Sequence, residues 1–259
     1  MNPIGVVICN YNKKDFVLQC VQSVLESKEK NFDIYVVDNA SSDGSAEALK
    51  KAYGNRITVI ENKENLGGSG GFNTGLRIVR DKGYSYFMCL DDDAAVDENA
   101  LSVLYHYMEE HTDTGMAGCR VYHTQMSDYI QQSGLLIDFD NCTAKTIGAD
   151  MPEDGSLPDV IECDTVATCA VMVRADTVKQ KGVGIMPEDN FIYWDDMEWG
   201  YRIKLAGYRV VTLAEAKALH QNGGEYKEGK YLYQLLYVEK PDQFLYAVYA
   251  GGADGGNEC

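Results

Sequence analysis

The first half of the chain alternates between short apolar runs and segments with helical spacing. The run IGVVIC at residues 4–9 is apolar at successive positions, which is typical of a strand buried on both faces of a sheet. Further strands are predicted at residues 33–37, 57–60 and 84–90. Helices are predicted between them, at residues 15–27, 46–53 and 72–82. Strands and helices that alternate with short connections predict an α/β fold with a mostly parallel sheet and helices on both faces.

The pattern is weaker after residue 97. Residues 196–206 can form a helix, because Trp199, Ile203 and Ala206 share one face and Gly207 supplies a stop. The other elements predicted here are a helix at 100–111, strands at 115–121, 166–173 and 209–213, a short helix at 176–180 and a mixture of strand and loop at 127–155. The tyrosine-rich residues 226–249 are predicted to be helical, and residues 251–259 are predicted to be disordered.

Polar or glycine-rich turns follow the predicted parallel strands. They are residues 10–12, 38–43, 65–71 and 91–93. In open parallel sheets, ligands bind outside the carboxyl ends of the strands. Each turn alone is more often a simple connection than a site, but their coincidence at one edge of the sheet indicates a binding site there.

Three adjacent carboxylates, Asp91, Asp92 and Asp93, end the apolar run at residues 84–90. If the strand continues, Asp91 and Asp93 point to one side and Asp92 to the other. Such a cluster is costly when desolvated and becomes favourable when it holds a divalent cation such as Mg²⁺ or Mn²⁺. A solvated acidic loop before a helix is an equal alternative for the motif taken alone.

The glycine-rich segment NLGGSGGFNTGL at residues 65–76 does not match the common phosphate-binding motifs. Asn73 stands where a dinucleotide-binding motif needs its last glycine, and Leu76 replaces the lysine that a P-loop requires. The remaining interpretation is a loop whose backbone approaches a ligand closely and leads into a helix N-terminus that favours anions.

A second acidic segment precedes the helix predicted at residues 196–206. Asp195, Asp196 and Glu198 lie in its first turn, next to Trp194. Acidic residues suit the positive end of a helix, so simple capping explains them. Carboxylates flanked by tryptophans are also typical of a site with a tuned acid or base.

Net charge and composition limit the classes of molecule that are expected to bind this protein. The 259 residues carry a net charge of −17, which argues against nucleic acid or an anionic membrane as the main partner. No apolar run approaches the roughly 18–20 residues of a membrane span, and the start of the chain does not resemble a signal peptide. The eight cysteines form no CxxC pair and lie mostly in apolar runs, so a reduced, cytoplasmic protein is expected.

Taken together, the motifs IGVVICNYN, VVDNASSDGS, NLGGSGGFNTG, LDDD, YWDDMEW and LHQNGG resemble, in order and spacing, the family 2 glycosyltransferases. These are inverting enzymes that use nucleotide sugars and have the GT-A fold, with a Rossmann-like central sheet and a small antiparallel addition. The resemblance covers roughly residues 4–224. NLGGSGGF and WDDMEW are most similar to rhamnosyl- and galactofuranosyltransferases of bacterial surface polysaccharides.

The resemblance implies roles for individual residues. Asp91, Asp93 and His220 would bind Mn²⁺ or Mg²⁺. Asp196 would take the proton from the acceptor hydroxyl, and Asp195 would orient the acceptor or donor. Trp199 could pack against a sugar ring or in the core. The residues expected along the nucleotide-sugar donor are Asn10, Tyr11, Asn12, Asp38, Asn39, Asn65, Gly67, Asn73, Asp92 and Trp194.

The function implied is metal-dependent transfer of a rhamnose- or galactofuranose-type sugar from a UDP- or dTDP-linked donor to a saccharide or lipid-linked acceptor. The alternatives are a catalytically impaired nucleotide-sugar-binding module and a nucleotidyltransferase. Residues 1–224 would form the transferase domain, and residues 225–259 a helical segment and tail whose truncation is left open. The expected location is the cytoplasm; docking to the inner face of the cell membrane and homo-oligomer formation are also left open.

Overall fold

The computed structural model describes residues 2–140, 143–188, 191 and 194–221. The predicted C-terminal segment at 225–259 lies outside the described residues. Among the described helices, none is both long and apolar enough to cross a lipid bilayer. The described cysteines are Cys9, Cys20, Cys89, Cys119, Cys163 and Cys169, and all of them are free thiols.

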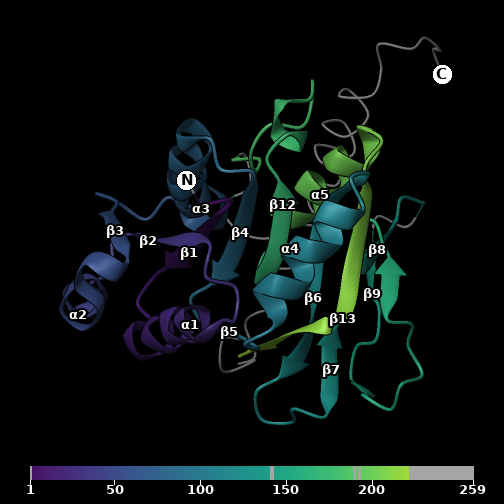
Figure 1. Ribbon diagram of the computed structural model, residues 1–259, viewed down its shortest axis with the longest axis horizontal. Helices are drawn as coiled ribbons and strands as arrows, with labels where there is room; N and C mark the ends of the chain where they lie inside the picture. Colours follow the sequence, from purple (N-terminus) through teal and green to yellow (C-terminus); the bar gives the residue numbers. More distant parts are fainter. Residues whose placement is uncertain (1, 141–142, 189–190, 192–193, 222–259) are drawn as a thin grey trace.

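A single large sheet runs through the molecule (Figure 1). Its first half consists of the parallel strands β1 (Ile4–Asn10), β2 (Phe32–Asp38), β3 (Thr58–Glu61) and β4 (Tyr86–Asp91), in the order β3-β2-β1-β4. Beyond β4 lie β12 (Ala170–Arg174), β6 (Thr114–His123) and β13 (Arg209–His220). β12 is antiparallel to both β4 and β6, whereas β13 runs parallel to β6. The predicted mostly parallel sheet is therefore confirmed.

Helices cover both faces of this sheet, as predicted. The helices are α1 (Lys14–Glu26), α2 (Ser45–Tyr53), α3 (Gly67–Lys82), α4 (Ala100–Glu110) and α5 (Asp195–Leu205). α1, α2 and α4 share one apolar cluster with Val6 and Ile8 of β1, and α3 and α5 share the other cluster with Val7. Because alternate side chains of β1 enter opposite clusters, the strand must be apolar at successive positions.

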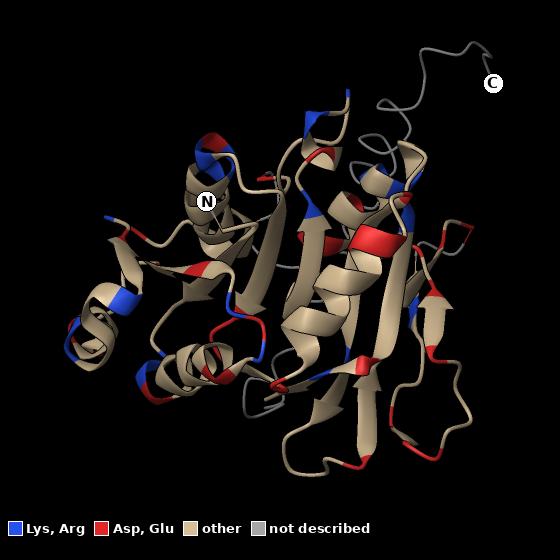
Figure 2. Ribbon diagram, viewed as in Figure 1, with Lys and Arg blue, Asp and Glu red and all other residues tan. Residues whose placement is uncertain are grey.

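The antiparallel addition is built from short elements. They are β5 (Ala94–Val96), β7 (Tyr129–Gln132), β8 (Leu135–Asp138), β9 (Thr143–Thr146), β10 (Met151–Pro152) and β11 (Val160–Glu162). β7 pairs with β6 and β10, β8 with β9, and both β5 and β11 pair with β13. Single 3₁₀ turns occur at η1 (Gly54–Arg56) and η2 (Thr177–Lys179). Charged positions lie mostly at turns, strand ends and outer helix faces, and the central strands carry few of them (Figure 2).

The predicted glycine loop at residues 65–71 is wrong, because α3 already begins at Gly67. Two of the glycines, Gly71 and Gly75, serve helix–sheet packing. A Cβ atom on Gly71 would lie 2.4 Å from Cys9 Sγ, and one on Gly75 would lie 2.4 Å from Val7 Cγ1. The absent side chains let α3 lie directly on β1, and sequence periodicity cannot distinguish this use of glycine from a ligand-binding loop.

Other boundaries differ where tertiary pairing extends or shortens an element. The strand predicted at 166–173 begins only at Ala170, and the short helix predicted at 176–180 is a single 3₁₀ turn. The strand predicted at 209–213 continues to His220, with a register irregularity against β6 between Leu213 and Lys217. This extension brings His220 to the end of β4.

Gly75→Ala is expected to destabilise the protein by about 1–3 kcal/mol, since the new methyl group overpacks the contact with Val7. Gly68→Ala is the matched control: its Cβ would meet Asp195 Oδ2 at 3.5 Å, an ordinary contact, and alanine favours the helix. Urea unfolding of both variants measures the difference. Equal stabilities would contradict close packing of α3 on β1 as the reason for glycine at position 75.

Candidate active site

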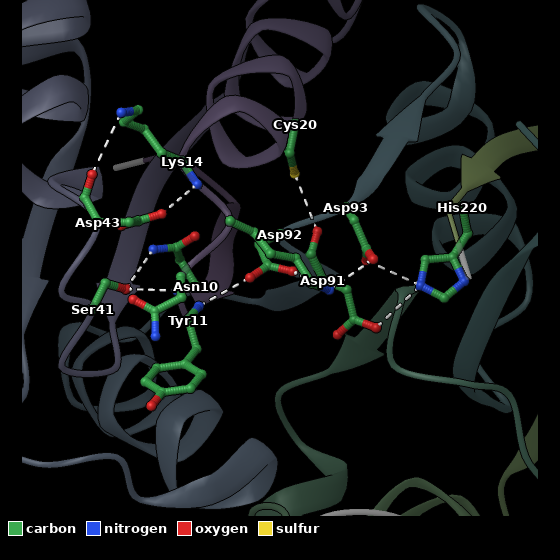
Figure 3. Close-up of polar contacts among 12 residues, drawn as sticks. Asn10, Tyr11, Lys14, Cys20, Ser41, Asp43, Asp91, Asp92, Asp93 and His220 are labelled. Carbon is green, nitrogen blue, oxygen red and sulfur yellow. Dashed lines mark hydrogen bonds and ion pairs between the residues drawn. The ribbon is translucent and has the colours of Figure 1, made fainter. Parts of the chain in front are cut away.

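The acidic turn that follows β4 is the centre of the site (Figure 3). β4 ends at Asp91, and Asp92 and Asp93 form the turn that leads into β5. Asp92 Oδ2 accepts a hydrogen bond of 2.9 Å from the Tyr11 backbone N–H, whereas Asp91 and Asp93 face His220. Asp92 therefore points away from Asp91 and Asp93, as predicted, although Asp92 and Asp93 lie in a turn and not in a continued strand.

Asp91, Asp93 and His220 can offer one ligand atom each, and these atoms all lie within 4.8 Å of one another. His220 Nε2 is 3.1 Å from Asp93 Oδ1 and 3.6 Å from Asp91 Oδ2. The main chain holds the two sides together, because the Gln221 N–H donates to the Asp93 carbonyl at 3.1 Å. Two carboxylate oxygens and an imidazole nitrogen are a donor set that fits Mn²⁺, and the carboxylates also fit Mg²⁺.

Lys13 is a member of this cluster that the sequence analysis missed. Its Nζ lies 2.7 Å from Asp93 Oδ2 and 3.1 Å from Asp92 Oδ1. Its position directly after the turn at residues 10–12, already predicted to lie at the ligand edge, was the available signal. In the absence of other cations, the ammonium group offsets part of the repulsion among the buried carboxylates.

Burial and charge perturb the titration of this cluster. Burial raises the pKa of Asp92 to about 6, although Lys13 and the Tyr11 N–H favour the carboxylate. The pKa of Asp93 is lowered despite its burial, because His220 and Lys13 stabilise the charged form. Burial would lower the pKa of His220, but Asp91 and Asp93 outweigh it and raise the value to about 9. The carboxylates thus already attract positive charge to this position.

The turns after β1 and β2 are bound to each other. Asn10 Nδ2 donates to Asp38 Oδ1 at 2.8 Å and to Ser41 Oγ at 3.0 Å, and Asn12 Oδ1 accepts from the Ser42 N–H at 2.7 Å. Asn10 and Asp38 are almost completely buried. The Tyr11 side chain, by contrast, is 46% exposed. Of the residues predicted to hold the nucleotide here, Tyr11 offers an accessible surface while Asn10 and Asp38 support the turns.

Asn39 organises the start of α3. Its side chain donates to Asn65 Oδ1 and to the Gly67 carbonyl, both at 2.9 Å, and accepts from the Leu66 N–H at 3.1 Å. The Gly67 N–H donates to Asn65 Oδ1 at 2.9 Å, and the Gly68 N–H donates to the Phe191 carbonyl at 2.8 Å. The first two N–H groups of α3 therefore bond within the protein and are not directed at a ligand.

Asn73 connects α3 to the segment that precedes α5. The side chain is completely buried, and its Nδ2 donates to the Met186 carbonyl and to Glu188 Oε1, each at 2.7 Å. Arg77, one turn further along α3, also pairs with Glu188. Direct contact with the donor is implied by the resemblance, whereas in this structure the Asn73 amide bonds within the protein. Asn73 instead fastens the approach to α5.

The second acidic pair lies at the start of α5. Asp195 is buried and points toward α3, where its Oδ2 lies 3.5 Å from the Cβ position of Gly68. Asp196 is partly buried; its Oδ1 accepts from the Met197 N–H at 2.8 Å, and its carbonyl accepts from Thr165 Oγ1 at 2.7 Å. Trp194 precedes the pair with a left-handed backbone, φ 69°. Asp196 is therefore held by hydrogen bonds from the Met197 N–H and from Thr165, while Asp195 lies against the start of α3.

The carboxyl groups of Asp195 and Asp196 interact electrostatically with Asp91. Burial and the charge of Asp196 raise the pKa of Asp195 to about 7, with a further contribution from Asp91. Burial raises the pKa of Asp196 to about 6, again with a contribution from Asp91. The charge of Asp91, at the end of β4, thus contributes to the titration of both carboxyl groups at the start of α5. A carboxylate with a pKa near neutrality is suited to accept and release a proton.

Trp199 belongs to the core. It has no exposed surface, lies in the cluster of α3 and α5, and its Nε1 donates to the Gly184 carbonyl at 3.1 Å. The suggestion that Trp199 packs against a sugar ring is wrong. Its spacing with Ile203 on one helix face already allowed the core interpretation.

Residues 5–169 match the protein family described as "Glycosyl transferase family 2". The chain belongs to this family. This family 2 chain is 26% identical over 146 residues to the teichoic acid poly(glycerol phosphate) polymerase of Staphylococcus epidermidis, covering 54% of the chain and 19% of that protein. It is 30% identical over 109 residues to the UDP-Glc:alpha-D-GlcNAc-diphosphoundecaprenol beta-1,3-glucosyltransferase WfaP of Escherichia coli, covering 42% of each. The chain thus spans less than half of these relatives.

Solved structures share the fold across nearly the whole family 2 chain. The mannosyltransferase PcManGT of Pyrobaculum calidifontis, in complex with GDP-Man and Mn²⁺, superposes with a TM-score of 0.65 at 16% identity, covering 99% of this chain and 66% of that one. S. aureus TarS 1-349 in complex with UDP gives 0.64 at 14% identity, covering 98% and 67%. The sheet, its helices and its antiparallel addition are therefore those of the GT-A fold.

Proposed function

We propose that this chain carries the catalytic domain of a metal-dependent inverting glycosyltransferase. It would move a sugar of the rhamnose or galactofuranose type from a nucleoside diphosphate to a saccharide or lipid-linked acceptor in cell-surface polysaccharide synthesis. The observation that carries the proposal is the cluster of Asp91, Asp93 and His220, whose ligand atoms lie within 4.8 Å of one another. The charge of Asp91 also raises the pKa values of Asp195 and Asp196, the pair that would handle the proton.

The named relatives support the donor and acceptor classes. PcManGT was solved with GDP-Man and Mn²⁺, and TarS with UDP, so both neighbours bind guanine or uracil nucleotides. WfaP is named for transfer from UDP-Glc to a diphosphoundecaprenol-linked sugar, and the S. epidermidis relative for teichoic acid polymerisation. A nucleotide or nucleotide sugar thus occurs in the descriptions of PcManGT, TarS and WfaP, a lipid-linked sugar in that of WfaP, and teichoic acid in that of the S. epidermidis relative.

The donor would lie across the ends of β1 and β4. Asp91, Asp93 and His220 would hold Mn²⁺ or Mg²⁺, which when bound neutralises charge on the departing nucleoside diphosphate. The exposed Tyr11 ring and Asn12 would contact the base and ribose, with Asn10, Asp38 and Asn39 keeping the turns in shape. The other residues that we propose to contact the donor are Asp92, Asn65, Gly67 and Trp194.

Asp196 would be the general base. A sugar hydroxyl is a weak nucleophile, so a carboxylate within hydrogen-bond reach must take its proton as the oxygen attacks. The new bond forms at the anomeric carbon while the bond to the diphosphate oxygen breaks, and the proton ends on Asp196. One displacement from the opposite face inverts the anomeric configuration. Asp195, more deeply buried and directed toward α3, would orient the reacting sugar.

Nucleotide binding is tested by thermal unfolding of the chain with Mn²⁺ and UDP, dTDP or GDP. A ligand present at 100 times its dissociation constant stabilises the folded state by about 2.7 kcal/mol, which corresponds to a Tm increase of about 5 °C for a chain of this size. The same nucleotides with EDTA are the control and should give a smaller shift. If no nucleoside diphosphate with metal raises the Tm, the proposal fails.

Turnover separates the proposal from its alternatives. UDP-galactofuranose and dTDP-rhamnose are supplied with Mn²⁺ and a saccharide or lipid-linked acceptor, and release of the nucleoside diphosphate is measured. Binding without release in every combination would identify a binding module. Pyrophosphate release from a nucleoside triphosphate would identify a nucleotidyltransferase.

A further inference from the structure

Gln131, in β7, makes two hydrogen bonds to the same residue, His220. Its Oε1 lies 2.8 Å from His220 Nδ1, and its Nε2 donates to the His220 carbonyl at 3.1 Å. The resemblance and the family comparison assign no role to Gln131, and the two residues are 89 positions apart in the chain. β7 reaches this place because it pairs with β6, the strand beside β13.

This pair of bonds determines which way both side chains face. A backbone carbonyl can only accept, so the amide end of Gln131 that faces it must be the NH₂ group. Oε1 then faces the ring, and the Nδ1 atom of His220 must carry a hydrogen to donate to it. The remaining ring nitrogen, Nε2, is turned toward Asp93 and Asp91, at 3.1 and 3.6 Å.

The main chain of His220 is already held by pairing with both β5 and β6, and the Gln221 N–H bonds to the Asp93 carbonyl. With the main chain held, the imidazole ring could still rotate about its side-chain bonds. Among the described residues, the hydrogen bond from the ring's far nitrogen goes to Gln131. The ring therefore presents Nε2 to the carboxylates because of this amide.

We propose that Gln131 is a positioning residue of the cation site, which holds His220 Nε2 toward Asp91 and Asp93 and thereby makes the site favour Mn²⁺ over Mg²⁺. Imidazole nitrogen suits transition metals, whereas Mg²⁺ is bound mainly through carboxylate and water oxygens. Partners that orient a metal-binding histidine tune affinity without touching the metal. This inference rests on the metal site of the proposed function and adds the source of its selectivity.

The test measures Mn²⁺ and Mg²⁺ affinities of the full chain in the absence of donor. Free Mn²⁺ is followed by electron paramagnetic resonance, and Mg²⁺ by competition. Gln131→Met, which lacks the acceptor, is expected to weaken Mn²⁺ binding about 10–100-fold, with a smaller loss for Mg²⁺. The nitrogen coupling of bound Mn²⁺ should weaken as well, which a general loss of stability would not cause selectively.

Three further variants serve as controls. Gln131→Glu keeps an acceptor for Nδ1–H but loses the donor to the His220 carbonyl, so its Mn²⁺ affinity should lie between those of Gln131→Met and the unmodified chain. Gln132→Leu is the matched control, because this neighbour in β7 donates to Cys169 Sγ and not to His220; its Mn²⁺ affinity should equal that of the unmodified chain. Gln131→Ala repeats the measurement in case methionine prevents folding.

The outcomes distinguish this inference from the proposed function. If the unmodified chain binds no Mn²⁺, the metal site of the proposed function fails. If it binds Mn²⁺ and Gln131→Met leaves the affinity unchanged, or lowers Mn²⁺ and Mg²⁺ affinity equally, Gln131 has no positioning role and the proposed function stands. A Mn²⁺ affinity of Gln131→Glu no higher than that of Gln131→Met would also overturn the inference.

Discussion

Asp196→Asn is expected to remove sugar transfer while leaving donor binding intact. An amide cannot accept the proton of the acceptor hydroxyl, and loss of a positioned general base costs on the order of 10²–10⁴ in kcat. Asparagine has nearly the size of aspartate, and its side-chain oxygen can still accept from the Met197 N–H. Steady-state transfer kinetics, together with donor titration, measure the two effects separately.

The control for this variant is Asp176→Asn, an exposed carboxylate that pairs with Lys179 away from the acidic turn. It should leave transfer unchanged. Asp195→Asn provides the comparison within the pair and should alter KM as well as kcat if Asp195 orients a sugar. Ordinary turnover by Asp196→Asn would show that the base is another residue.

Asp93→Ala is expected to weaken Mn²⁺ binding by at least about 100-fold, more than the loss typical of an outer partner. The variant removes one of the three candidate ligands and leaves Lys13 with Asp92 as its remaining partner in the turn. The measurement is Mn²⁺ titration without nucleotide, followed by the Tm shift with UDP and Mn²⁺, which should disappear.

Asp92→Asn is the contrasting variant for the metal experiment. Asp92 lies in the same turn but faces the Tyr11 N–H, and its oxygens are not among the three ligand atoms that gather at His220. Its Mn²⁺ affinity should fall less than that of Asp93→Ala. If Asp93→Ala bound Mn²⁺ as the unmodified chain does, the cation would have to bind elsewhere.

Local patterns identified most of the fold. Apolar residues at successive positions in β1 reflect burial on both faces, and this pattern is visible in any window of the chain. Glycine was the main source of error at the start of α3, because Gly71 looks the same in sequence whether its missing side chain admits a ligand or, as here, β1. Strand ends were also misplaced where pairing with a distant strand decides them, as in β13.

The residues of the candidate site were likewise predicted only in part. Asp91, Asp93 and Asp196 were recognisable because motifs keep them in a fixed local order, and the resemblance then added His220. The hydrogen bonds of Asn73 and Gln131 were not predicted, since their partners lie 113 and 89 positions away. No local rule specifies which amide will meet which carbonyl across such a separation.

The sequence by itself determined the α/β class, the edge of the sheet at which the turns gather, and the acidic residues available for chemistry. Only the tertiary structure decided that Lys13 bridges Asp92 and Asp93, that the first N–H groups of α3 bond within the protein, and that Gln131 orients His220. Periodicity and motif order are properties of neighbouring residues. Hydrogen-bond partners depend on distances that exist only after the strands and helices have packed together.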